Sequence, residues 1–172
     1  MHDLFEGVGP NLFHCILTHF IAQGKITVDK INYRFESFDF GMHYNNSRPS
    51  QIKQSFLKGE TSGGQNASQN LGLILFLPSL IGDLIVPEND IWELLLTFVE
   101  ILHLILASQI SKGGIVYLNS LIEEFLLNYQ KLFHKNLKPK HHHMLHYSRA
   151  IQEIGPLRQF WSMTFESRHK FF

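Results

Sequence analysis

Three successive segments of the chain repeat apolar side chains at the three- and four-residue spacing of an α-helix. The three segments cover about residues 69–84, 88–110 and 115–135. In the last segment Leu118, Ile122 and Phe125 share one face, whereas Glu123 lies on the other. This pattern predicts a mainly α fold, because regular strands would show a two-residue alternation instead.

The N-terminal third is less regular. Pro10 suits the first turn of a helix and Gly24 suits its C-terminal end. Residues 32–40 alternate imperfectly, so residues 25–50 are expected to give an extended loop or at most one or two short strands. The Gly-, Ser- and Asn-rich stretch 58–70 predicts a flexible loop.

Composition excludes several classes of protein. The chain has 172 residues, 44% of them hydrophobic, and no formal net charge, whereas disordered chains combine low hydrophobicity with high net charge. The single cysteine, Cys15, excludes an internal disulfide framework and is expected to be a buried helical thiol. No signal peptide is expected, and no membrane span either, since the apolar stretches 71–86 and 91–110 carry charged residues.

Histidine is the residue type in excess, with 11 copies. His142 and His146 are four residues apart and would share a helix face, where such a pair can bind a metal such as zinc. The alternative is a pair of hydrogen-bonded histidines that support a polar pocket. Glu166 and His169 are three apart on a predicted helix, and there the alternative is an exposed salt-bridge face.

Four separated blocks of the chain resemble animal CACTA (En/Spm-type) DDE DNA transposases and their domesticated relatives. The blocks are MHDLFEGVGP at 1–10, LPSLIGDLIVPENDIWELLL at 77–96, YLNSLIEEFLLNYQKLFHKNLKPKHHHMLHYSRAI at 117–151 and GPLRQFWSMTFESRHKFF at 155–172. They keep the order of the family blocks. Departures are Ser148, where the family has proline, Thr164, where it has arginine, and Ser167-Arg168, where it usually has alanine and lysine.

The resemblance implies a division into three parts. Residues 1–51 would be a remnant of an RNase H-like core, with one helix and an extended segment. Residues 52–135 would be a helical insertion. Residues 136–172 would be C-terminal helices that carry the catalytic glutamate. The expected fold is therefore mainly α, made of the insertion and the C-terminal helices of an RNase H-like catalytic domain.

The resemblance also implies a chemistry. Family enzymes hold two Mg²⁺ ions with two aspartates and a glutamate, and the ions activate the attacking oxygen and stabilise the leaving one. By position Glu166 would be that glutamate. His169, His142, His146 and His2 would lie near it, where they orient Glu166 or contact the DNA backbone.

Both family aspartates lack a counterpart, because the pattern places them before Met1. The resemblance therefore implies a transposase-derived fragment that is inactive alone and needs no cofactor alone, although the parent family uses Mg²⁺ and DNA. It also suggests a nuclear protein. The alternative is a non-catalytic helical module that binds a partner protein or a second copy of itself through exposed apolar helices.

Overall fold

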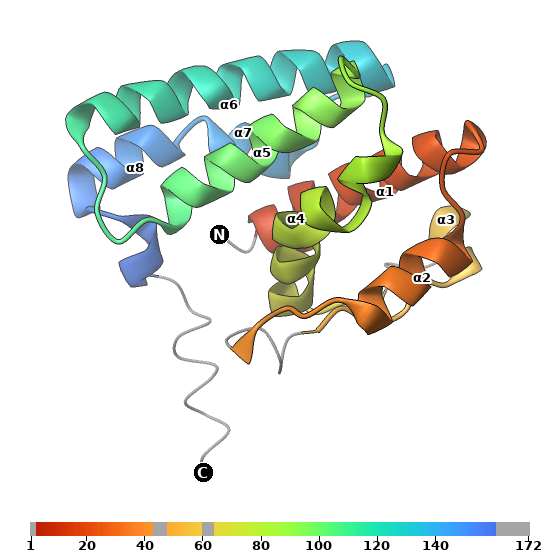
Figure 1. Ribbon diagram of the computed structural model, residues 1–172. Coiled ribbons are helices and arrows are strands. Elements are labelled where there is room, and N and C mark those ends of the chain that lie inside the picture. The colour runs from red at the N-terminus through yellow and green to blue at the C-terminus, as the bar shows by residue number, and fades with distance from the viewer. Residues whose placement is uncertain (1–2, 43–47, 60–63, 161–172) are drawn as a thin grey trace. The chain divides into compact units, whose positions relative to one another are not determined.

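The computed structural model describes residues 3–42, 48–59 and 64–160. Over these residues the chain is mainly helical and contains no strand, which confirms the mainly α prediction (Figure 1). The helical elements are η1 (Leu4–Val8), α1 (Gly9–Ala22), α2 (Val28–Ser37), α3 (Gln54–Leu57), α4 (Ala67–Ile81), η3 (Gly82–Leu84), α5 (Asp90–Leu106), α6 (Lys112–Phe133), α7 (Pro139–Met144), α8 (Tyr147–Ile154) and η4 (Leu157–Phe160). They form two compact units, with the boundary between Leu96 and Thr97 inside α5.

The N-terminal unit is built around α1. Pro10 lies in the first turn of this helix, and Gly24 follows its end with a φ of 68°, as the sequence predicts. Leu12, Ile16 and Phe20 are all fully buried, at the four-residue spacing that marks the inner face of a helix. Cys15 is buried on the same helix, as predicted.

The expectation of a strand or extended loop at residues 32–40 is wrong over most of that stretch, where α2 forms instead. The Thr27 side chain accepts a hydrogen bond from the Lys30 backbone N–H, which caps the helix N-terminus. Ile31 and Phe35 then bury one face at four-residue spacing. The aromatic residues at 33, 35, 38 and 40 suggested alternation, but helix capping and the buried face decide the local structure.

Helix α4 begins inside the stretch predicted to be a flexible loop. Asn66 and Gln69 form a reciprocal capping box, in which each side chain accepts from the other's backbone N–H. Helix α4 continues through Pro78 to Ile81. Pro78 removes one backbone hydrogen bond, but Leu77 and Leu80 on either side are buried, and packing holds the turn in place.

A buried polar contact ties α4 to the start of the chain. Asn70 is 6% exposed, and its Nδ2 donates to the carbonyl oxygen of Phe5 at 2.8 Å. The π-helical segment η1 leaves carbonyl groups outside the regular α-helical pattern, and Asn70 satisfies one of them.

The stretch Ala67–Leu84 is the one segment of the described residues that is long and apolar enough to cross a membrane. It has 18 residues and a mean hydropathy of 1.2 over that window, and 44% of the window is buried. This is weak support for a span, since core helices of water-soluble proteins have the same composition.

The C-terminal unit packs around α6. Phe98 of α5 stacks on Phe125 of α6, with ring centroids 5.0 Å apart and an interplanar angle of 29°. Both side chains are fully buried. Helix α8 lies beside α6 (Figure 1). The predicted face of α6 is confirmed, since Leu118, Ile122 and Phe125 are all buried and Glu123 is exposed.

Candidate functional site

The histidine-rich segment forms α7 and the turn that leads into α8. Pro139 occupies the first turn of α7, where its missing N–H is not needed. After Met144 the backbone stays right-handed: Leu145 has φ −60° and ψ −21°, and His146 has φ −91° and ψ −7°. The amide of Leu145 donates to the His142 carbonyl, and that of His146 donates to the His143 carbonyl, both at 3.1 Å. This tight turn keeps residues four apart on the same side.

His142 and His146 are brought together as the sequence predicts. Their ring centroids are 5.2 Å apart and their planes are nearly perpendicular, at 86°. Both side chains are exposed. The remaining predicted site residues, His2, Glu166 and His169, lie outside the described residues. The arrangement of the predicted carboxylate site therefore stays a prediction.

His141 has an environment that the sequence analysis did not predict. Its side chain is 1% exposed and lies against Tyr129 of α6, with ring centroids 4.8 Å apart. Its Nδ1 accepts a hydrogen bond from the Lys138 backbone N–H at 3.2 Å, which places the proton of the neutral ring on Nε2. Within the described part of the chain, that Nε2 and the buried Oγ of Ser148 have no hydrogen-bond partner.

Burial lowers the pKa of His141 below its ordinary value of 6.5, and the positive charge of Lys138 adds to this effect. The signal for burial is present in the sequence. His141, Met144, Ser148 and Ile151 recur every three or four residues and are all buried, so His141 belongs to the apolar face of the segment. The three consecutive histidines conceal this pattern, since only one of them faces inward.

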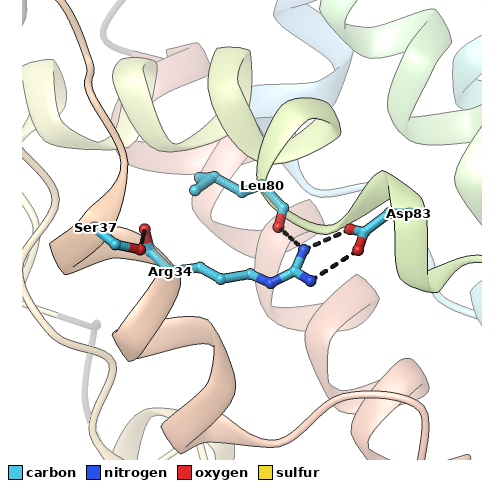
Figure 2. Close-up of polar contacts among 4 residues, drawn as sticks. All are labelled: Arg34, Ser37, Leu80 and Asp83. Atoms are coloured by element: carbon cyan, nitrogen blue, oxygen red, sulfur yellow. Dashed lines mark hydrogen bonds and ion pairs between the residues drawn. The ribbon is translucent and has the colours of Figure 1, made fainter.

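A second polar cluster lies between α2 and the end of α4 (Figure 2). The Arg34 guanidinium forms two hydrogen bonds with the Asp83 carboxylate, at 2.5 and 2.8 Å, and a third with the carbonyl oxygen of Leu80 at 2.6 Å. Arg34 thus binds both an acidic side chain and a carbonyl oxygen in the last turn of a helix, where a cation is favoured. The hydrogen bond from Arg34 holds the pKa of Asp83 below its usual range.

The Arg34–Asp83 cluster borders a small cavity of about 190 Å³, lined by Arg34, Ser37, Phe38, Ser79 and Leu80. The Ser37 hydroxyl donates to carbonyl oxygens of its own helix, those of Tyr33 and Arg34. The guanidinium and this hydroxyl both have hydrogen-bond partners within the chain. The cluster is therefore explained as a structural contact that holds α2 against the end of α4, rather than as a ligand-binding site. It fixes the IGD portion of the second resemblance block against α2.

We expect replacement of Arg34 by Met to lower the melting temperature more than replacement of Asp83 by Asn. Both variants lose the ion pair, but Asp83→Asn keeps the bond from Arg34 to the Leu80 carbonyl, whereas Arg34→Met loses that bond as well. Thermal unfolding followed by circular dichroism checks the order of the two variants. An equal or larger loss in Asp83→Asn would show that the Leu80 contact contributes nothing.

Comparison with protein-family models, with curated proteins and with solved structures finds no match. Among residues 3–42, 48–59 and 64–160, no group of three or more His, Cys, Asp and Glu side chains is placed to hold a metal ion. The described part of the predicted site is thus the pair His142 and His146, with His141 buried behind them.

Proposed function

We propose that this chain is a transposon-derived helical portion of a CACTA-type DDE transposase, and that it does not cleave DNA by itself. The observation that carries the proposal is the order of the four blocks at 1–10, 77–96, 117–151 and 155–172. Support also comes from α3, α4, α5 and α6, which fall within residues 52–135, where the resemblance implies a helical insertion. The three-part division and the RNase H-like core remain part of the proposal.

The proposed lack of DNA cleavage by the chain alone follows from the charge of two Mg²⁺ ions, which one carboxylate cannot balance. Two Mg²⁺ ions need several carboxylate oxygens to balance and orient them at a phosphodiester. The resemblance assigns one such group, Glu166, to this chain. A single carboxylate cannot oppose four positive charges, so the chain would need aspartates from elsewhere. In the completed site, Mg²⁺ would be the cofactor and DNA the substrate, in the nucleus.

A local charge pattern supports contact with DNA. The whole chain has no net charge, but residues 125–152 contain five Lys and Arg residues and no Asp or Glu. The same stretch holds the exposed imidazoles of His142 and His146. Positive groups concentrated on one segment attract phosphates, and this attraction weakens as salt rises. We assign these two histidines to DNA-backbone contact or to the orientation of Glu166.

DNA binding is the positive test of the proposal. The chain should bind duplex DNA in fluorescence anisotropy, with an affinity that falls as salt increases. Lys131 and Lys138 are exposed in the basic stretch, and Lys53 and Lys58 are exposed outside it. Charge reversal of the first pair to Glu should weaken binding at least about tenfold, whereas the same change in the second pair, a control matched in charge, should have little effect. Equal losses in both variants would contradict a localised DNA surface.

Strand cleavage is the complementary test. Supercoiled plasmid incubated with the purified chain and Mg²⁺ or Mn²⁺ should stay intact. Metal-dependent nicking by the wild-type chain that disappears in Glu166→Gln would show that the chain is a nuclease alone, and the proposed inactivity would be wrong. Glu124→Gln serves as the control, since Glu124 is an exposed acid of α6.

The alternative, a helical module that self-associates, has one favourable observation. Val116 and Leu127 of α6 are 65% and 68% exposed and are eleven residues apart, which places them on one line of the helix. Exposed Ser120 and Glu123 interrupt this line, so the two side chains do not form a continuous apolar face. A dimer in light scattering that Leu127→Lys converts to monomer would favour the alternative over the transposase-derived proposal.

A further inference from the structure

The turn between α7 and α8 places two imidazoles at a separation that suits one metal ion. We propose that His142 and His146 together bind a single divalent transition-metal ion of the zinc, nickel and copper class. The ligands of this ion would be nitrogen atoms, whereas the Mg²⁺ ions of the proposed function would have carboxylate ligands; a bound ion would occupy the same two imidazoles that the proposed function assigns to DNA or to Glu166.

The distance between the rings supports chelation. A tetrahedral ion bound to two imidazole nitrogens at about 2.0 Å brings the ring centres to roughly 5 Å from each other. The observed separation is 5.2 Å. The ring planes are nearly perpendicular, at 86°, so the two rings do not stack on each other. A pair of histidines four residues apart on a helix is also the arrangement that holds zinc in known motifs.

The two rings have no competing interactions in the described part of the chain. Within residues 3–42, 48–59 and 64–160, the rings of His142 and His146 contact each other, and their ring nitrogens make no hydrogen bond or ion pair. Other histidines differ in this respect: the His14 ring is within hydrogen-bond distance of the Leu57 carbonyl, and His141 accepts from Lys138. The exposure of His142 and His146 gives an ion direct access from solvent.

The donor set defines the class of ion. Neutral imidazole favours zinc, nickel and copper, whereas Mg²⁺ favours oxygen ligands. Two protein ligands leave two positions of a tetrahedral ion for water. The residue after the first histidine is His143, whereas zinc proteases with an H-E-x-x-H motif have the catalytic glutamate there. Position 143 therefore lacks the glutamate that acts as the general base in those proteases.

A bound metal ion would also stabilise the turn between α7 and α8. His142 lies in the last turn of α7 and His146 is the residue just before α8, so one ion would hold the end of one helix to the start of the next. An ion that binds only this folded arrangement stabilises it. The melting temperature should consequently rise with zinc concentration.

The experiment is a calorimetric titration of the untagged, full chain with ZnCl₂ at pH 7.5. We expect saturable binding of one ion per chain, unaffected by excess Mg²⁺. His142→Gln and His146→Gln should each weaken zinc binding by about a hundredfold or more. A single remaining imidazole would bind the ion without the affinity gain that a second, linked ligand provides. His143→Gln is the matched control, since His143 is an exposed neighbour on a different side of the helix, and it should bind as wild type does.

Circular dichroism of each variant separates loss of binding from loss of structure. Three outcomes would overturn the proposal: no saturable binding, binding that survives in the His142→Gln/His146→Gln double variant, and a zinc-induced rise in melting temperature that the double variant retains. The DNA-binding and cleavage tests use no zinc, so the two proposals can fail independently.

Discussion

Replacement of Phe125 by Ala should lower the free energy of unfolding by about 3–5 kcal/mol, the largest effect expected of any substitution considered. Phe125 is fully buried in α6, where it stacks on Phe98 and lies 6.1 Å from the Tyr129 ring. Truncation removes apolar area from the core and leaves a cavity that helices held by other contacts cannot fill. It also removes a stacked aromatic pair, worth about 0.5–1.5 kcal/mol beyond its area.

Leu127→Ala is the matched control, two residues further along the same helix. Leu127 is 68% exposed, so its truncation should change the stability by no more than about 0.5 kcal/mol. Urea unfolding followed by circular dichroism measures both variants. A loss below about 1 kcal/mol for Phe125→Ala would mean that the contact between α5 and α6 does not form the core of the C-terminal unit.

The second large effect is a loss of stability in mildly acidic solution that depends on His141. Its ring is buried against Tyr129, and its Nδ1 already accepts the Lys138 backbone N–H. Protonation would bury a positive charge and place a hydrogen on Nδ1, where it meets the amide hydrogen of Lys138. The fold therefore favours the neutral ring, which lowers the pKa of His141 from 6.5 in the folded state.

Because the folded state lowers the pKa of His141, the protein should lose stability as the pH falls. Below the unfolded-state pKa, near 6.5, the unfolded chain binds a proton at this position more readily than the folded chain does. The contribution of His141 to stability is thus complete above about pH 6.5, falls as pH decreases below that value, and levels off below the lower folded-state pKa. The slope reaches at most about 1.4 kcal/mol per pH unit, since one group is involved.

His141→Asn isolates this effect. The Asn Oδ1 can replace the acceptor that Nδ1 provides to Lys138, but the side chain does not titrate. Urea unfolding between pH 5 and pH 8 should show a smaller loss at low pH for His141→Asn than for wild type. Burial and the charge of Lys25 also lower the pKa of His19, so some pH dependence should remain in His141→Asn. Parallel profiles for wild type and His141→Asn would contradict the assignment.

The sequence predicted most helices because their signals are local. The face of α6, the span of α5 and the limits of α1 follow from apolar spacing and from Pro10 and Gly24. Prediction failed at α2, where closely spaced aromatic residues resembled an alternating strand. The capping bond of Thr27 was readable in principle, but the burial of Ile31 and Phe35 depends on helices distant in sequence.

In the candidate site, too, the sequence predicted some features and only the tertiary structure showed the others. The four-residue spacing predicted that His142 lies beside His146, and the right-handed turn between α7 and α8 keeps the two rings together although the helix is interrupted there. The sequence analysis did not separate His141 from them, although its spacing to Met144, Ser148 and Ile151 follows the buried face; the packing of its ring against Tyr129 is seen only in the tertiary structure. The assignment of Glu166 depends on a resemblance of ordered blocks and falls outside the described residues.

The sequence by itself determined the helical class and the positions of most helices, because each depends on the 3.6-residue period of one continuous segment. The four-residue spacing also indicated that His142 and His146 are neighbours. Only the tertiary structure decided that Arg34 binds Asp83 and Leu80, more than forty residues away, and that Asn70 satisfies the carbonyl of Phe5. Such contacts need a fixed arrangement of separate helices. That arrangement arises from burial summed over the core, which local spacing does not encode.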